Sequence, residues 1–109
     1  MFKINDKGEI SITRGDTGIF TLDISTSDGS SYDYSNDEVL FTVKRTVYDA
    51  EHVIQKRITY GENVTILPSD TSSLSYADYV FDVQVTTAGG IVDTVIPPSK
   101  FTVRSEVTF

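Results

Sequence analysis

Apolar side chains occupy every second position in one segment after another of this chain. Residues 79–85 read Tyr-Val-Phe-Asp-Val-Gln-Val, which places Tyr79, Phe81, Val83 and Val85 on one face. A period of two indicates a β-strand with one buried and one solvated face. Because the same period recurs over almost the whole chain, the sequence predicts an all-β domain of antiparallel strands.

Turn-forming residues separate the alternating segments about every eight to twelve positions, a spacing typical of β-sandwiches. The predicted extended segments, of which the first two are short, are residues 2–4, 9–13, 17–25, 38–45, 53–58, 64–67, 79–85, 91–96 and 101–109. The sequence therefore predicts an immunoglobulin-like antiparallel β-sandwich of about seven or eight strands, although periodicity alone does not separate a sandwich from a barrel.

Several connections can also be predicted from turn chemistry. Polar turn residues suggest that 2–4 pairs with 9–13, and that 53–58 pairs with 64–67 as a second hairpin. The segment 68–74 starts with proline and predicts one short helical turn whose last residue, Leu74, reaches the core. Pro97-Pro98 is expected to interrupt the ladder between the last two strands.

The composition fits one globular domain spanning residues 1–109. Hydrophobic residues make up 39% of the chain and charged residues 23%, values that disfavour disorder. The chain has no Cys, which excludes disulfides and thiolate metal sites. Stability must then come from packing and from the backbone ladder.

The net charge of −7 bears on the partners that the chain can bind. The only adjacent basic pairs are Lys44-Arg45 and Lys56-Arg57, so nucleic acid and anionic membranes are disfavoured. No apolar run approaches the ~20 residues of a spanning helix. The start lacks the apolar stretch of a secretion signal, so we expect the chain to stay in the cytosol that makes it.

Few residues suggest catalysis or metal binding. His52 is the only histidine, and it lies in a polar loop without other ligands of the kind zinc prefers. Asp28, Asp33 and Asp37 share a hydroxyl-rich loop, but their spacing does not match a helix-loop-helix calcium site. We expect solvated loop residues in both cases, with no catalytic residue, metal or cofactor.

Residues 14–16, Arg-Gly-Asp, match the tripeptide that integrins recognise on exposed loops. Gly-Asp is also an ordinary turn pair between two strands, and three residues are a weak signal. The turn interpretation is therefore favoured.

Four pieces of the chain together resemble a known family. They are residues 12–17, residues 37–44, residues 66–71 with Leu74, and residues 79–83 followed by 90–95. In this order and spacing they resemble small β-sandwich proteins of phages and prophages of Gram-positive bacteria, similar to the amino-terminal domain of the baseplate upper protein. The resemblance implies a structural protein of the virion tail that contacts other copies or other baseplate proteins.

The sequence leaves two non-enzymatic hypotheses open. The first is an assembly module that offers unpaired edge strands, at residues 9–13 or 101–109, to other phage proteins or to copies of itself. The alternative is a carbohydrate- or ligand-binding module that uses loop tyrosines. The tyrosines in question are Tyr32, Tyr34, Tyr48 and Tyr60.

Overall fold

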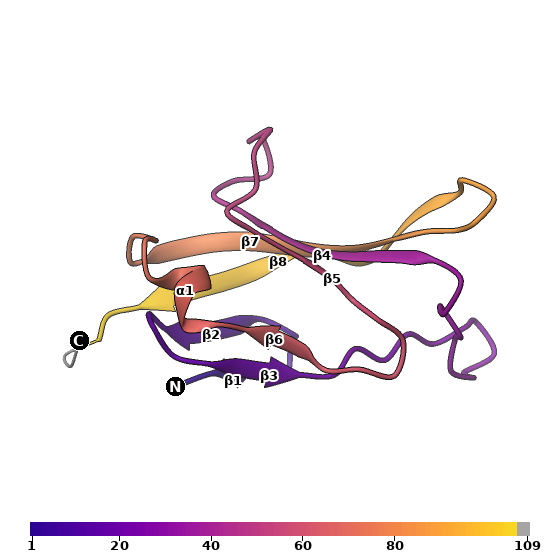
Figure 1. The fold of residues 1–109 in the computed structure, drawn as a ribbon, viewed down its shortest axis with the longest axis horizontal. Coiled ribbons are helices and arrows are strands. Elements are labelled where there is room, and N and C mark those ends of the chain that lie inside the picture. The colour runs from indigo at the N-terminus through magenta and orange to yellow at the C-terminus, as the bar shows by residue number, and fades with distance from the viewer. Residues whose placement is uncertain (107–109) are drawn as a thin grey trace.

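A computed structural model describes residues 1–106 and consists mostly of β-strands (Figure 1). The larger sheet contains, in spatial order, β1 (Lys3–Ile4), β2 (Ile10–Thr13), β8 (Val92–Arg104), β7 (Ala77–Thr86), β4 (Glu38–Lys44) and β5 (Ile54–Arg57). A second sheet pairs β3 (Gly18–Phe20) with β6 (Val64–Ile66), and the short helix α1 (Pro68–Thr71) follows β6. The prediction of an all-β fold is confirmed.

The core lies between the two sheets and follows the alternation in the sequence. On β4, Val39, Phe41 and Val43 are fully buried, while the residues between them are only half-buried. The ring of Phe41 lies 5.3 Å from that of Phe81 on β7 and 5.6 Å from that of Phe20 on β3, measured between centroids. Side chains from both sheets therefore share one interior.

The six-stranded sheet curls at its β1 end toward the smaller sheet. Phe2, just before β1, stacks on Phe20 of β3 with centroids 5.9 Å apart. Gly18 makes this approach possible, because a Cβ at that position would lie 2.5 Å from Cδ2 of Phe2. The hairpin of β1 and β2 thus helps to close the core on one side.

One pairing departs from the antiparallel prediction. β2 runs parallel to β8, with Ile10 opposite Phe101 and Ile12 opposite Val103. Alternation reports which face of a strand is buried but not its direction, so the sequence pattern could not distinguish the two arrangements. A parallel pair needs a long crossover, and here almost the whole chain lies between the two strands.

The predicted hairpin between residues 53–58 and 64–67 is wrong. β5 pairs with β4 in the large sheet, whereas β6 pairs with β3 in the small one. The turn around Gly61 therefore carries the chain from one sheet to the other instead of reversing it within a sheet. Turn residues mark where the chain bends, and both segments gain a better buried partner elsewhere.

Three predicted strands differ by more than two residues from those in the structure. Residues 91–96 and 101–109 join into the single strand β8, and Pro97 and Pro98 fall within a register shift, between the pairs Val83–Ile96 and Phe81–Ser99. Residues 107–109 lie outside the described part of the chain. The predicted strand 17–25 shortens to β3, after which the chain follows an irregular path.

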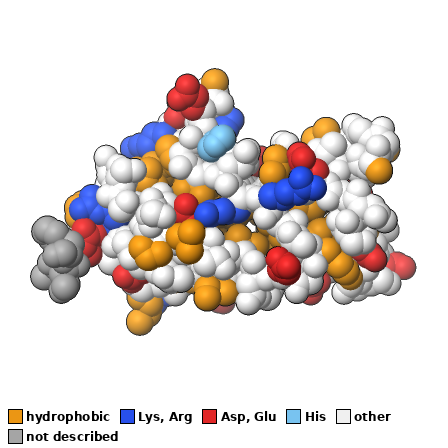
Figure 2. Space-filling model, in the orientation of Figure 1, with side chains coloured by type: hydrophobic (Ala, Val, Ile, Leu, Met, Phe, Trp, Pro, Cys, Tyr) orange, Lys and Arg blue, Asp and Glu red, His pale blue; other side chains and the backbone are white. Residues whose placement is uncertain are grey.

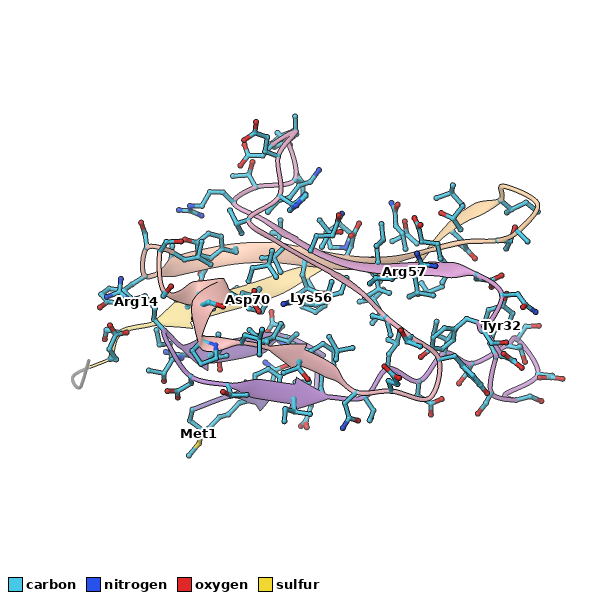
Figure 3. All side chains as sticks on the ribbon, in the orientation of Figure 1. Met1, Arg14, Tyr32, Lys56, Arg57 and Asp70 are labelled. Carbon is cyan, nitrogen blue, oxygen red and sulfur yellow. The ribbon has the colours of Figure 1, made fainter. Side chains whose placement is uncertain are left out.

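The predicted helical turn is confirmed as α1. The Asp70 carboxylate accepts a hydrogen bond of 2.7 Å from the amide of Leu67 and pairs with Nζ of Lys56 on β5, also at 2.7 Å (Figure 3). Leu74 packs partly buried against the core, as predicted. The helix thus links the strand before it to the edge of the large sheet.

Candidate interaction surface

The four candidate tyrosines do not form one site. Tyr34 is buried at 4% exposure, and its ring meets that of Tyr60 edge-on with centroids 4.9 Å apart. Tyr32 is half-buried and donates a hydrogen bond to the Asp37 carboxylate, which raises the pKa of the Tyr32 hydroxyl. Tyr48 is 93% exposed in the loop between β4 and β5. Tyr48 and Tyr60 are therefore the exposed rings of the set.

Two of the three loop aspartates, Asp28 and Asp33, are used to form turns. Asp28 accepts hydrogen bonds from the Thr26 hydroxyl and the Ser30 amide, which lower its pKa to about 2. Asp33 likewise accepts from the amide of Ser35, two residues further on. Among residues 1–106, no three His, Asp or Glu side chains are grouped as a metal ion would need. The arrangement shapes the loop between β3 and β4, since each carboxylate bonds its own local backbone or side chains.

His52 lines a shallow groove of about 310 Å³ on the outer face of β4 and β7. Asp82 is the one carboxylate in its lining, and burial raises the pKa of this group while nearby Lys44 opposes the rise. Leu40 contributes to the floor, which explains an apolar residue at an outward position of β4. One carboxylate and one imidazole in the lining of a groove, with no hydrogen bond between them in the described residues, are a weak basis for acid-base catalysis.

The Arg-Gly-Asp turn is part of the scaffold. The Arg14 guanidinium bonds both carboxylate oxygens of Glu106, at 2.8–3.2 Å, and also the carbonyl of Leu74 (Figure 3). The amide of Gly15 donates to the buried hydroxyl of Thr71 at 2.9 Å. Because these contacts tie the turn to α1 and to the end of β8, the structure favours the turn interpretation.

The predicted open edges are wrong. β2 lies between β1 and β8, and residues 101–104 of β8 lie between β2 and β7. The sequence reveals which positions alternate but not which strands end up on the outside of a sheet. The outer strands of the large sheet are instead β1 and β5.

A further edge opens in the first half of β8. Residues 92–96 pair with β7 alone, because β2 covers only residues 101–104. Together with the end of β7 they form a hairpin that extends beyond the core, drawn in orange in Figure 1. We call residues 84–96 the hairpin arm.

Apolar side chains are exposed at the end of the hairpin arm. Ile91 is 69% exposed and Val92 is 59% exposed. On the face shown in Figure 2, the tip at the upper right carries hydrophobic and uncharged side chains. An unpaired strand edge next to exposed apolar side chains is a feature that proteins use for binding other chains.

Comparison with protein-family models, with curated proteins and with solved structures finds no match to this chain. Within residues 1–106, no helix has the length and apolar character needed to cross a membrane.

The sequence predicts a strand at residues 91–96 but not its exposed position, although the sequence contains a signal for that exposure. Asp93 is the only charged residue between positions 83 and 99, in a chain where charged residues make up 23%. The run looks like an ordinary core strand by its apolar content. Only the structure reveals that the core ends before the strand does.

Proposed function

We propose that this chain is a non-enzymatic assembly module that binds other proteins through exposed strand edges. The observation that carries the proposal is the hairpin arm, where the edge of residues 92–96 and the side chains of Ile91 and Val92 face solvent. Apolar groups and unpaired strand edges in water are costly to a monomer and favourable at an interface. Val85, Val95 and Ile96 at the base of the arm lie in the core or pack against it, whereas its tip does not, so contact with another chain supplies a physical reason for the exposed tip.

An immunoglobulin-like sandwich is the fold that we propose for the finer topology. The order β8-β7-β4-β5 corresponds to the sheet of the final strands in variable-type immunoglobulin domains, and β3-β6 to part of the facing sheet. A second feature supports this proposal. The hydroxyl of Tyr79, near the start of β7, donates to the carbonyl of Ser75 at 2.9 Å, as in the tyrosine corner of that fold.

Assembly into a phage or prophage tail, close to the baseplate, is the setting that we propose for this binding. It rests on the resemblance to small phage sandwich proteins of residues 12–17, residues 37–44, residues 66–71 with Leu74, and residues 79–83 followed by 90–95. The partners would be other tail proteins or copies of this chain. In this setting the chain is made in the bacterial cytoplasm and ends in the virion.

Mass spectrometry and electron microscopy of native particles test the setting. We expect the chain in purified virions of the source phage, with density at the tail tip. A variant with Ile91→Ser and Val92→Ser should fold but enter particles poorly, whereas Val47→Ser in the β4–β5 loop serves as an exposed apolar control. Purified virions without the chain would contradict the tail role.

The alternative function is carbohydrate binding through the exposed rings of Tyr48 and Tyr60. A glycan array with the wild-type chain tests it, and loss of any signal in Tyr48→Ala or Tyr60→Ala would support it. Since Tyr34 is buried and Tyr32 is bonded to Asp37, two of the four tyrosines contribute to packing in the structure.

A further inference from the structure

The groove that His52 lines lies on the outer face of the large sheet, beneath a loop. Its lining includes Leu40 of β4 and Val80 of β7, both half-buried. The loop between β4 and β5 projects from the sheet (Figure 1) and contributes further lining residues, so it forms one wall. Asp82 lies two residues after Val80 on β7 and therefore on the same face. The carboxylate of Asp82 thus sits among apolar side chains.

Asp82 has no hydrogen-bond donor and no ion-pair partner among residues 1–106, although it is half-buried. The structure of β8 beside it provides a reason. The register shifts between the pairs Phe81–Ser99 and Val83–Ile96, which places Pro97-Pro98 next to Asp82, and proline has no amide proton. A partly desolvated carboxylate without a donor is unfavourable, so a ligand that donates to it gains free energy.

Two side-chain amides in the groove also present acceptors. Nε2 of Gln55 donates to the hydroxyl of Thr42 at 3.2 Å, and Nε2 of Gln84 donates to the hydroxyl of Thr94 at 3.3 Å. Each amide therefore directs its nitrogen to a threonine and keeps its carbonyl oxygen as an acceptor. Thr42 lies opposite both Asp82 and Gln55 in the ladder, so these three form one row across the sheet.

A cation with several N–H donors matches one carboxylate and two amide carbonyls. A guanidinium group has five donors in a planar fork and can bond a carboxylate through two of them, whereas an ammonium group has three donors on one atom. The methylene groups of an arginine can lie against Leu40 and Val80. The net charge of −7 also attracts a basic partner.

We propose that this groove binds an arginine side chain of a partner protein, with Asp82 as the anion that holds the guanidinium. The inference rests on the proposed assembly role and names the chemistry of the partner. The groove adjoins the hairpin arm, because Gln84 belongs to both. A shallow groove of about 310 Å³ cannot enclose a small molecule, whereas a protein brings further contacts around the rim.

Lys44 limits the affinity of the groove for a cation. It is the one lysine or arginine in the lining, and the described structure contains no ion pair between it and Asp82. Because Lys44 repels a guanidinium, Lys44→Gln should bind arginine about threefold more tightly. A ligand with its own carboxylate, such as a free amino acid, would instead bind this variant more weakly.

Titration of the chain with capped tripeptides, followed by NMR, tests the site. The peptide Gly-Arg-Gly should shift the side-chain amide signals of Gln55 and Gln84 in a saturable way, with a dissociation constant in the millimolar range. In the matched peptide, citrulline replaces arginine and keeps its size without its charge. This peptide should bind about tenfold more weakly. Added salt should weaken binding of the arginine peptide, because it screens the attraction.

Matched variants assign the effect to one carboxylate. Asp82→Asn keeps the shape of the side chain and should raise the dissociation constant about tenfold. Asp6→Asn makes the same charge change at an exposed residue of the β1–β2 turn and should leave it within about twofold of wild type. Val47→Ser at the rim changes no acceptor and should also stay within about twofold. Circular dichroism and thermal unfolding establish that each variant folds.

The outcomes separate the site from the assembly role. Absence of a saturable shift, equal binding of the two peptides, or an unchanged affinity in Asp82→Asn would overturn the inference. In native particles, Asp82→Asn should be incorporated less than Asp6→Asn. Equal incorporation would overturn the partner assignment but leave assembly through the hairpin arm intact. If virions lack even the wild-type chain while the arginine peptide binds at Asp82, the tail role fails and the site stands.

Discussion

The two halves of β8 both mix apolar and polar residues, but they have different surroundings. Residues 101–104 lie between β2 and β7, with Phe101 and Val103 buried in the core. Residues 92–96 pair with β7 alone, and Val92 is exposed. We call these the closed half and the open half. The difference shows that one-sided pairing is enough to form a strand, whereas pairing on both sides coincides with the buried core.

Truncating an aromatic ring in the closed half should have the largest effect. Phe101 is fully buried, and its ring centroid lies 6.3 Å from that of Phe41. Phe101→Ala should lower the free energy of unfolding by about 3–5 kcal/mol, because it removes buried area and leaves a cavity. Ile91→Ala in the hairpin arm should change it by no more than about 0.5 kcal/mol. Urea denaturation measures both, and equal losses would remove the distinction between the halves.

The second largest effect on stability is expected in the hairpin of β1 and β2, which pairs with the closed half. A methyl group at Gly18 would collide with the ring of Phe2, so Gly18→Ala should destabilise the fold by about 1–3 kcal/mol. Combining it with Phe2→Ala should relieve the collision. The double variant should then lose less than the sum of the two single losses, measured by the same denaturation. If the two single losses simply add in the double variant, the ring of Phe2 does not pack against Gly18.

The sequence allowed the buried faces of the long strands to be predicted, and the structure shows why. Alternation at Val39, Phe41 and Val43 reflects burial, which is a property of each strand alone. Alternation does not indicate which strands pair with one another. The parallel pairing of β2 with β8, for example, joins distant parts of the chain. Likewise, β5 and β6 lie in different sheets because β5 pairs with β4 and β6 pairs with β3.

The candidate surface was harder to predict for the same reason. Whether residues 92–96 are a core strand or an exposed arm depends on where β2 ends, which local sequence does not encode. The loop tyrosines were visible in the sequence, but burial of Tyr34 depends on its contact with Tyr60 from another loop. Low charge around Asp93 was the one local signal of the arm.

A smaller loss of stability is expected when the hydroxyl of Tyr79, next to the closed half, is removed. Tyr79 lies opposite Phe101 in the ladder, is 4% exposed, and donates to the carbonyl of Ser75. Tyr79→Phe should lower the free energy of unfolding by about 0.5–1.5 kcal/mol, since the acceptor loses its partner. Tyr48→Phe, at a residue 93% exposed, is the control and should be neutral. A neutral Tyr79→Phe would argue against a tyrosine corner.

The smallest effect concerns the segment that follows the closed half, and it depends on pH. The amide of Arg14 donates to the carbonyl of Arg104 at 2.9 Å, and its guanidinium bonds Glu106. The hydrogen bond from Arg14 lowers the pKa of Glu106 in the folded state. A carboxyl group with a lowered folded pKa contributes stability above its unfolded pKa and loses it as pH falls through the folded value.

Glu106→Gln isolates this contribution, because it keeps the shape of the side chain and removes its titration. The thermal unfolding midpoint of the variant should lie below that of wild type at neutral pH, and the two should converge in acid as wild-type Glu106 becomes protonated. Asp93→Asn in the open half removes one negative charge at an exposed residue and serves as the control for the change in net charge. Parallel pH profiles for Glu106→Gln and wild type would show that Glu106 does not anchor the end of β8.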